Sequence, residues 1–192
     1  MLEIELKARL EPQRIPHLKE RLGAEFSLRR TLEERDIYYQ APDRDFKETD
    51  EALRVRNRRQ GLEEVTALLT YKGPKIDDLS NTRVELETEV GDADKIQAML
   101  TALGYTVILT VDKKRSEYQG KGKNEKITLC LDQVEGLGHF VELEYIAPDD
   151  LPDEERESIR DRLLSLMADL GVPRRNLTRK SYLELLIQRA TS

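Results

Sequence analysis

Charged and apolar residues alternate with a period of two in several stretches of the chain, which is the pattern of β-strands with two unlike faces. In the first stretch Glu3 and Glu5 share one face, whereas Ile4 and Leu6 share the other. The alternating stretches are residues 2–6, 53–58, 83–90 and 140–145, and further strand candidates lie near 34–40, 65–72, 105–118 and 126–133. The pattern therefore predicts about eight strands.

Four other stretches carry apolar residues at spacings of three and four, as amphipathic helices do. They span residues 12–23, 92–103, 153–170 and 178–190. The first three stop at Gly23, Gly104 and Gly171, and glycine is a common residue at a helix C-terminus. Strands interspersed with helices in this way predict an α+β fold.

The helices need apolar surface to cover, and each strand offers it on one face only. If the helices pack on the apolar faces of a curled eight-stranded sheet, the charged faces turn inward and line a tunnel. The competing interpretation is that each charged face is solvated. Taken together, the charged residues favour the tunnel, because charges of the same sign gather on the same strand. Glutamates occupy positions 3, 5, 142 and 144, and arginines occupy positions 54 and 56.

Length and charge narrow the class of protein. The chain has 192 residues, and we expect residues 1–192 to form a single domain. Its 38 acidic and 32 basic residues give a formal net charge of −6, which argues against a nucleic-acid partner. No stretch approaches the roughly 18–20 apolar residues of a membrane span. Glutamates occupy the start of the chain, where a signal peptide is apolar, so we expect no membrane partner and a cytoplasmic location.

A tunnel lined with charges is costly unless something occupies it, because buried charges must be paired or bind ions. Rows of glutamates beside rows of lysines and arginines match the needs of a polyphosphate with divalent metal ions. Carboxylates bind Mg²⁺ or Mn²⁺, and the basic side chains neutralise the remaining phosphate oxygens. The charged fraction of 36%, against about 25% in an ordinary globular domain, is then explained by the site itself.

The segment EIELK at 3–7 resembles the Glu-x-Glu-x-Lys signature of the CYTH superfamily, which contains class IV adenylyl cyclases and thiamine or inorganic triphosphatases. Seven further segments follow in the family's order: DIYYQAP (36–42), ALRVRNR (52–58), LLTYKGPK (68–75), RVELETEV (83–90), VDKKRSEY (111–118), LCLDQVEGLGHFVELEY (129–145) and RKSYLELL (179–186). The resemblance covers nearly the whole chain. It implies an eight-stranded antiparallel β-barrel that encloses a charged triphosphate tunnel, with the helices packed outside.

The resemblance also implies the roles of individual residues. The expected ligands of Mg²⁺ or Mn²⁺ are Glu3, Glu5, Asp132, Glu142 and Glu144. The basic residues expected to bind the triphosphate are Lys7, Arg54, Arg56, Lys72, Arg83, Lys113 and Arg115. The expected catalytic residues are Glu5, Lys7, Arg56, Lys113 and Arg115, while Glu85 and Glu87 match further acidic tunnel positions.

Two reactions are known for such a site. In a cyclase the ribose 3′-oxygen attacks the α-phosphorus of ATP and pyrophosphate leaves, whereas in a triphosphatase water attacks the terminal phosphorus. Residues 129–145 and 179–186 resemble the cyclase branch, so we expect conversion of ATP to cyclic AMP and pyrophosphate. An inorganic or thiamine triphosphatase and a non-catalytic module that binds nucleotides or polyphosphate stay open. The oligomeric state also stays open, with a homodimer as one candidate.

Other residues receive simpler interpretations. Cys130 is the only cysteine, which excludes an internal disulfide framework, and we expect it to be a small core residue. Arg179 and Lys180 precede the last helix, which lies near one tunnel mouth in the family, so they are candidates for substrate contact. Replacing Arg56 with Ala is expected to leave the melting temperature nearly unchanged, because it relieves repulsion between basic residues in the empty tunnel.

Overall fold

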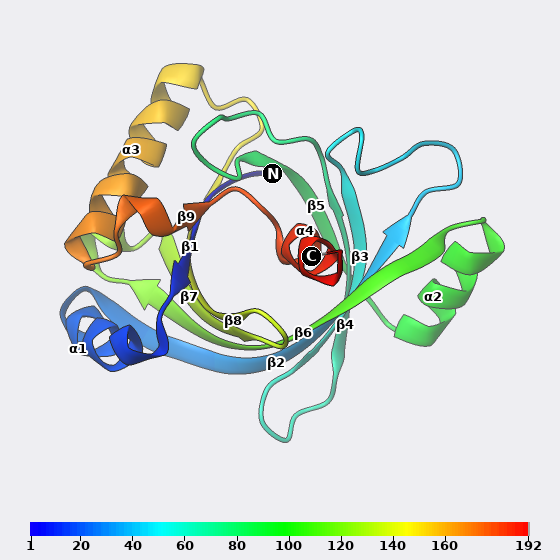
Figure 1. Cartoon of the computed structure of the whole chain (residues 1–192), viewed down its shortest axis with the longest axis horizontal. Coiled ribbons are helices and arrows are strands. Elements are labelled where there is room, and N and C mark those ends of the chain that lie inside the picture. The colour runs from blue at the N-terminus through cyan, green and yellow to red at the C-terminus, as the bar shows by residue number, and fades with distance from the viewer. Residues whose placement is uncertain (192) are drawn as a thin grey trace.

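The strands form one antiparallel sheet that curls and closes on itself. The computed structural model describes residues 1–191, and in this range the strand order is β5-β4-β3-β2-β6-β7-β8-β1-β9. The strands are β1 (Leu2–Leu10), β2 (Phe26–Gln40), β3 (Ala52–Arg59), β4 (Thr66–Lys72), β5 (Arg83–Val90), β6 (Thr106–Gly120), β7 (Ile127–Val134), β8 (Gly138–Ala147) and β9 (Leu177–Thr178). Pairing of Glu3 in β1 with Arg83 in β5 closes an eight-stranded barrel (Figure 1). The predicted α+β barrel is confirmed.

The alternation along each strand decides which side chains face into the barrel. On β1, Ile4 and Leu6 belong to an outer apolar cluster, whereas Glu3, Glu5 and Lys7 line an internal cavity. Successive side chains of a strand point to opposite faces, so the same division follows along the neighbouring strands. The charged faces therefore turn inward, as the alternation predicts.

Two helices cover the outer face of β1, β7 and β8. They are α1 (Ile15–Glu25) and α3 (Asp153–Asp169), which lie together at one side of the barrel (Figure 1). Leu22 on α1 and Leu163 and Met167 on α3 are at most 1% exposed. Burying a side chain of this size is worth about 1.5–3 kcal/mol relative to leaving it in water, so this layer is a main source of the barrel's stability.

A third helix, α2 (Ala93–Ala102), covers the other side of the barrel, where Ile96 and Leu100 pack against a cluster that includes Val55 of β3. The Asp92 side chain caps its first turn by accepting a hydrogen bond from the Lys95 backbone N–H at 2.9 Å. The outer face of β5 is different, because Val84 and Leu86 remain 38% and 57% exposed. The helices thus do not cover every apolar strand face, contrary to the expectation from the sequence.

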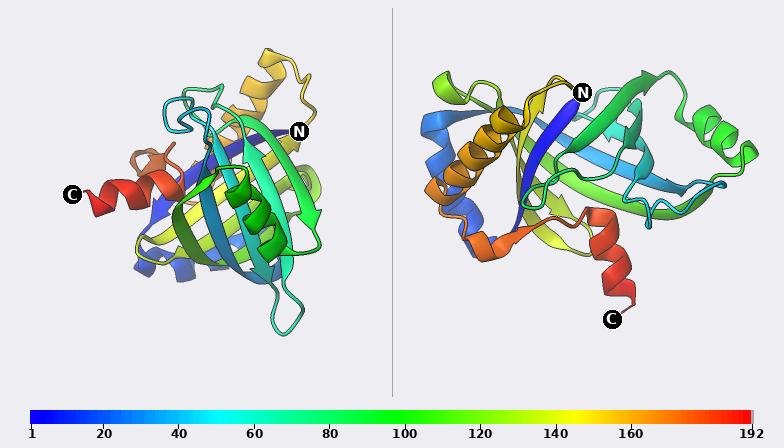
Figure 2. Two further views of the ribbon diagram at one scale, coloured as in Figure 1. Left: turned by 90° about the vertical axis from the view of Figure 1, so that its right-hand side faces the viewer. Right: turned by 90° about the horizontal axis from the view of Figure 1, so that it is seen from above.

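The last helix, α4 (Tyr182–Ala190), starts at one opening of the barrel and projects outward from it, so that it is seen end-on in Figure 1 and from the side in Figure 2. It begins later than the predicted residue 178, because Leu177 and Thr178 form β9 and pair with β1. The Ser181 and Glu184 side chains then form a capping box, which satisfies backbone N–H groups at the start of the helix. This start places Tyr182 at the barrel opening.

Other boundaries differ from the predicted ones for local reasons. The first helix passes Gly23 and ends at Glu25, since Gly23 does not take the left-handed conformation that Gly104 and Gly171 take at φ +90° and +78°. β2 starts at Phe26 rather than near residue 34, because it pairs with β6 along its whole length. Short 3₁₀ turns span Pro12–Arg14, Gly122–Asn124 and Arg174–Asn176. Within residues 1–191, no helix has both the length and the apolar character needed to cross a membrane.

Candidate active site

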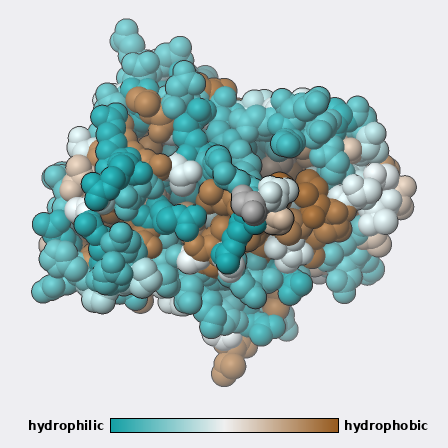
Figure 3. All heavy atoms as spheres, viewed as in Figure 1, coloured by the Kyte–Doolittle hydropathy of each residue, from teal (hydrophilic) through white to brown (hydrophobic). Residues whose placement is uncertain are grey.

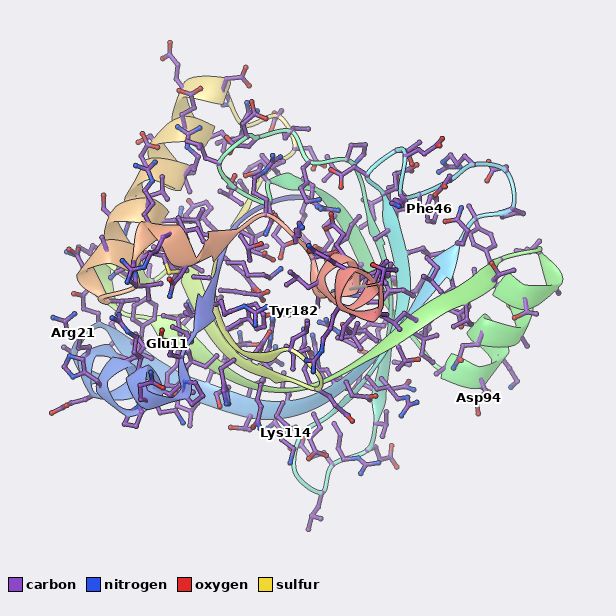
Figure 4. All side chains as sticks on the ribbon, viewed as in Figure 1. Glu11, Arg21, Phe46, Asp94, Lys114 and Tyr182 are labelled. Carbon is purple, nitrogen blue, oxygen red and sulfur yellow. The ribbon has the colours of Figure 1, made fainter. Side chains whose placement is uncertain are left out.

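The inner face of the barrel encloses a cavity of about 760 Å³. Its lining includes nearly all the residues that the sequence singles out: Glu3, Glu5, Lys7, Arg54, Arg56, Lys72, Arg83, Glu85, Glu87, Lys113, Arg115, Glu142 and Glu144. Asp132 is not part of this lining. Figure 4 shows the strands' side chains pointing into the centre of the ring, where Tyr182 joins them from α4.

Three carboxylates in this cavity are close enough to share one metal ion. Glu3, Glu5 and Glu144 each place an oxygen atom within 4.8 Å of the others. Glu5 and Glu144 are direct cross-strand partners on β1 and β8, while Glu3 is the next inward residue along β1. We call Glu3, Glu5 and Glu144 the acidic triad. Hard divalent cations prefer such oxygen ligands, so the donor set fits Mg²⁺ or Mn²⁺.

The electrostatics of the acidic triad are those of carboxylates crowded together in a buried place. Burial raises the pKa of Glu144 to about 7, with the neighbouring carboxylates of Glu142 and Glu5 adding to the effect. Burial likewise raises the pKa of Glu3 well above its ordinary value, and Glu85 contributes. A bound cation would favour the ionised form of each carboxylate.

Basic side chains are shared among the acidic groups at this side of the cavity. Lys7 lies 3.1 Å from both Glu5 and Glu142, and Lys72 lies 2.9 Å from Glu3 and 2.5 Å from Glu85. Burial alone would lower the pKa of each lysine, but the adjacent carboxylates hold it above its ordinary value. Both lysines are therefore positively charged.

A second group of carboxylates lies on β2 and was not identified from the sequence. Asp36 accepts two hydrogen bonds from Arg56, at 2.6 and 2.7 Å, and Glu34 lies 3.3 Å from Lys113 and accepts a hydrogen bond from Arg58 at 2.8 Å. We call Glu34 and Asp36 the β2 pair. Although burial opposes ionisation, these basic partners hold the pKa of Glu34 and of Asp36 well below the ordinary range.

The β2 pair corrects the expectation about Arg56. The sequence led us to expect repulsion between basic residues and a melting temperature that hardly responds to Arg56→Ala. The structure does not support that premise, because Arg56 is paired with buried Asp36. We now expect Arg56→Ala to be destabilising, since it would leave Asp36 buried without its main partner and an uncompensated buried charge is costly. The period-two spacing of Glu34, Asp36 and Tyr38 was the signal that could have identified this inner face.

Asp132 and Glu142, which the resemblance implies as metal ligands, lie outside the acidic triad. Asp132 is 2% exposed and accepts hydrogen bonds from Arg115, at 2.8 and 2.6 Å. Glu142 pairs with Arg115 and with Lys7. Both carboxylates thus hold basic side chains in place, and Arg115 reaches onward to Glu144 at 3.1 Å.

Tyr182 of α4 is a further residue of the cavity that sequence reasoning missed. Its hydroxyl donates to Asp132 at 2.9 Å, and its ring lies 4.5 Å from Lys7 Nζ and 5.3 Å from Lys113 Nζ. The two candidates before it do not line the cavity, since Arg179 donates to the Ser80 carbonyl and Lys180 to the Gln188 side chain. The resemblance placed the last helix near a tunnel mouth, but it pointed to Arg179 and Lys180 rather than to Tyr182 as the residue inside the cavity.

Cys130 faces the interior of the barrel rather than the outer apolar clusters. It alternates with Leu129 and Leu131, which belong to the outer cluster, and it pairs across the strands with Glu117 and Glu142. Cys130 is fully buried, so its expected place as a small core residue is confirmed, although it belongs to none of the outer apolar clusters. Burial raises the pKa of its thiol well above the ordinary value, so the reactive thiolate is disfavoured.

The chain is similar to known proteins over nearly its whole length. A model of the CYTH domain matches residues 1–182. The "putative adenylate cyclase" of Methanocaldococcus jannaschii is 37% identical over 186 residues, which is 96% of this chain and 98% of the relative. The adenylate cyclase CyaB of Aeromonas hydrophila is 31% identical over 162 residues, covering 83% of this chain and 75% of the relative.

Solved structures share the fold. The PH1819 protein of Pyrococcus horikoshii has a TM-score of 0.86 and 39% identity, covering 97% of this chain and 99% of that one. The "putative adenylyl cyclase HpAC1" of Hippeastrum, for which a dominant triphosphatase activity is described, has a TM-score of 0.65 and 16% identity, covering 100% of this chain and 96% of that one. At that identity the second likeness concerns the fold alone.

Proposed function

The chain belongs to the CYTH domain family, and we propose that it is a metal-dependent enzyme that converts ATP to cyclic AMP and pyrophosphate. The observation that carries the proposal is the acidic triad, which shares one cavity with a set of lysines and arginines. Such a lining accommodates a divalent cation and a polyanion together. The net charge of −6 favours a small triphosphate over a nucleic acid as the substrate.

In this proposal Glu3, Glu5 and Glu144 hold Mg²⁺ or Mn²⁺. The closeness of their oxygens and the raised pKa of Glu144 support the assignment, since they describe crowded, buried carboxylates that the neighbouring basic side chains only partly neutralise. Such an ion supplies positive charge that polarises phosphate oxygens. Asp132 and Glu142 act without contacting the metal ion themselves, because they orient Arg115 and Lys7.

The basic residues bind the phosphates and stabilise charge that develops during the reaction. We assign phosphate binding to Lys7, Arg54, Arg56, Lys72, Arg83, Lys113 and Arg115, and transition-state stabilisation to Lys7, Arg56, Lys113 and Arg115. Carboxylates already hold these side chains in fixed positions, so little reorganisation is needed when the substrate arrives. Arg83 is the least compensated of them, as its contact with Asp50 is 4.0 Å long.

Cyclisation rather than hydrolysis depends on how the triphosphate is placed. The ribose 3′-oxygen must lie roughly 3–3.5 Å from the α-phosphorus and in line with the departing pyrophosphate. A shift of the same triphosphate along the cavity would instead expose its terminal phosphate to water. The names of the Methanocaldococcus and Aeromonas relatives support cyclisation.

Product analysis tests the proposal. The protein is incubated with ATP, tripolyphosphate or thiamine triphosphate, in Mg²⁺ or Mn²⁺, and every product is identified by chromatography. We expect cyclic AMP and pyrophosphate from ATP. Release of orthophosphate from tripolyphosphate without any cyclic AMP from ATP would assign a triphosphatase, and no turnover of any compound would assign a binding module.

Two wider properties belong to the same proposal. We propose that residues 1–192 act as one domain, because the cavity draws side chains from β1 near the start of the chain and from α4 near its end. We also propose a cytoplasmic site of action, since ATP is made and used inside cells. Limited proteolysis and cell fractionation test these two points.

A further inference from the structure

A group of apolar side chains lines one end of the cavity, although most of the lining is charged or polar. Tyr38, Ala52, Ile108, Leu183 and Ile187 line this end, and we call these five residues the apolar vestibule. Leu183 and Ile187 are four residues apart on α4 and therefore share one face of the helix. Figure 3 shows hydrophobic side chains gathered around the centre of the face on which α4 lies.

A β-bulge presents Ile108 to the apolar vestibule. Tyr38 pairs with Leu109 and Tyr39 pairs with Val107, so Ile108 is an extra residue on β6 with no partner opposite. Bulges next to functional sites re-aim a side chain in this way. Ile108 remains 39% exposed although it lies in a cavity. Exposed apolar side chains gathered in a hollow are typical of a ligand-binding groove.

The apolar vestibule directly adjoins the phosphate-binding side chains. Tyr38 lies opposite Arg54 in the β2–β3 ladder, and Ala52 lies opposite Lys72 in the β3–β4 ladder. On α4, Leu183 follows Tyr182, whose ring contacts the Lys7 ammonium at 4.5 Å. A group held in the apolar vestibule is therefore continuous with a triphosphate held by these basic residues.

The charges at this end of the cavity are unfavourable for phosphate itself. Asp50 and Glu184 meet here, since Lys75 lies 2.5 Å from one and 3.5 Å from the other. The lining contributed by the loop after β2 adds Asp45 and Glu51 to Asp50. Because Lys75 and Arg44 are already paired with these carboxylates, this end offers little free positive charge to a phosphate, so the uncharged part of the substrate is the part that fits here.

We propose that the apolar vestibule binds the nucleoside of a nucleoside triphosphate, with the phosphates directed toward the acidic triad. This inference rests on the proposed function, in that the cavity must bind a triphosphate. It adds that α4 and the Ile108 bulge select an organic triphosphate over bare tripolyphosphate. Apolar contact with the nucleoside, which bare tripolyphosphate cannot make, discriminates between the two ligands.

The test compares two ligands on matched alanine variants. Leu183→Ala and Ile108→Ala remove side chains of the apolar vestibule. Leu185→Ala is the control, because Leu185 lies on the same helix and is partly buried but does not line the cavity. In the presence of Mg²⁺ we measure turnover of one of the two ligands, ATP or tripolyphosphate. The other ligand is then added at increasing concentration as a competitive inhibitor of that turnover. Each experiment thus yields one apparent affinity per ligand.

We expect Leu183→Ala and Ile108→Ala each to weaken ATP relative to tripolyphosphate by about 10-fold, while Leu185→Ala leaves that ratio within about 2-fold of the wild type. A ratio unchanged in both vestibule variants, or changed equally by Leu185→Ala, would overturn the inference and leave the proposed function standing. Formation of cyclic AMP is measured in a separate assay. If no cyclic AMP forms, the proposed cyclisation is wrong, but the proposed binding site for the nucleoside is still tested by the ratio of the two affinities. A wild-type protein that turns over neither ligand would remove both.

Discussion

Two groups of buried carboxylates face each other across the barrel, and their surroundings differ in charge. The acidic triad belongs to a side where acidic residues outnumber basic ones. There Glu3, Glu5, Glu85, Glu142 and Glu144 share Lys7, Lys72 and Arg115, and Glu85 also lies 3.6 Å from Arg54. The β2 pair lies on a side where the reverse holds, since Glu34 and Asp36 contact Arg54, Arg56, Arg58 and Lys113.

The difference shows that the tunnel is polarised. On the acidic side the pKa of Glu144 rises to about 7, whereas on the basic side the pKa of Glu34 and of Asp36 is lowered. A side short of positive charge attracts a metal cation, and a side with surplus positive charge attracts phosphate. The same residue type therefore serves two purposes, metal binding in the triad and positioning of arginines in the β2 pair.

The largest expected effect comes from removing a charge of the acidic triad. Glu5→Gln keeps the size of the side chain but removes an anionic ligand, so turnover should fall by at least about 10²-fold. Initial rates of product formation in Mg²⁺ measure this. Glu11→Gln, at an exposed glutamate outside the cavity, is the control and should keep full activity. Turnover that persists both in EDTA and in Glu5→Gln would end the metal assignment.

On the basic side the main effect should be on stability. Asp36→Asn removes the carboxylate that accepts two hydrogen bonds from buried Arg56 and leaves it only the contact with Glu34 at 3.3 Å. This change should cost about 3 kcal/mol and lower the melting temperature by roughly 6–12 °C. The matched control is Asp112→Asn, because Asp112 also pairs with an arginine across β2 and β6 but its side chain is 39% exposed. That change should cost less than about 1 kcal/mol. Equal losses for both variants would show that burial of the Asp36 pair is unimportant.

The β2 pair also predicts how stability depends on pH. The pKa of Asp36 is lower in the folded state than in the unfolded chain, so the unfolded chain binds the extra proton and stability is lost as the pH falls below about 4. One such group contributes a slope of at most about 1.4 kcal/mol per pH unit. Urea unfolding of wild type and Asp36→Asn between pH 5 and pH 3 should show a shallower slope in the variant. Parallel slopes would contradict the assignment.

A smaller effect is expected where α4 meets the barrel. Tyr182→Phe keeps the ring beside Lys7 but removes the hydrogen bond to Asp132, which should cost about 1.5 kcal/mol. Because the ring remains, turnover should fall only a few-fold. Tyr182→Leu, which removes the ring as well, should raise the KM for the triphosphate further. If Phe and Leu at this position behave alike in KM, the ring does not position the lysines.

The sequence predicted the inward faces of β1, β3, β5 and β8 because a period of two is a local property of the chain. It did not separate Glu144 from Asp132, since both are carboxylates on inward faces of predicted strands. Strand register brings Glu144 beside Glu5, whereas Asp132 lies among Arg115 and Tyr182. Register and the docking of α4 depend on contacts between residues far apart in the chain, which periodicity does not encode.

Binding of Mn²⁺, followed by electron paramagnetic resonance, tests the division between the two sides most directly. Glu144→Gln should weaken Mn²⁺ at least about 10-fold, because it removes a ligand of the acidic triad. Glu34→Gln should leave the affinity within about 2-fold of the wild type, since the β2 pair faces arginines and a lysine. Asp132→Asn should weaken Mn²⁺ binding by a factor between those two. The account would be contradicted if Glu144→Gln bound Mn²⁺ as tightly as the wild type does. It would also be contradicted if Glu34→Gln weakened Mn²⁺ binding as much as Glu144→Gln does.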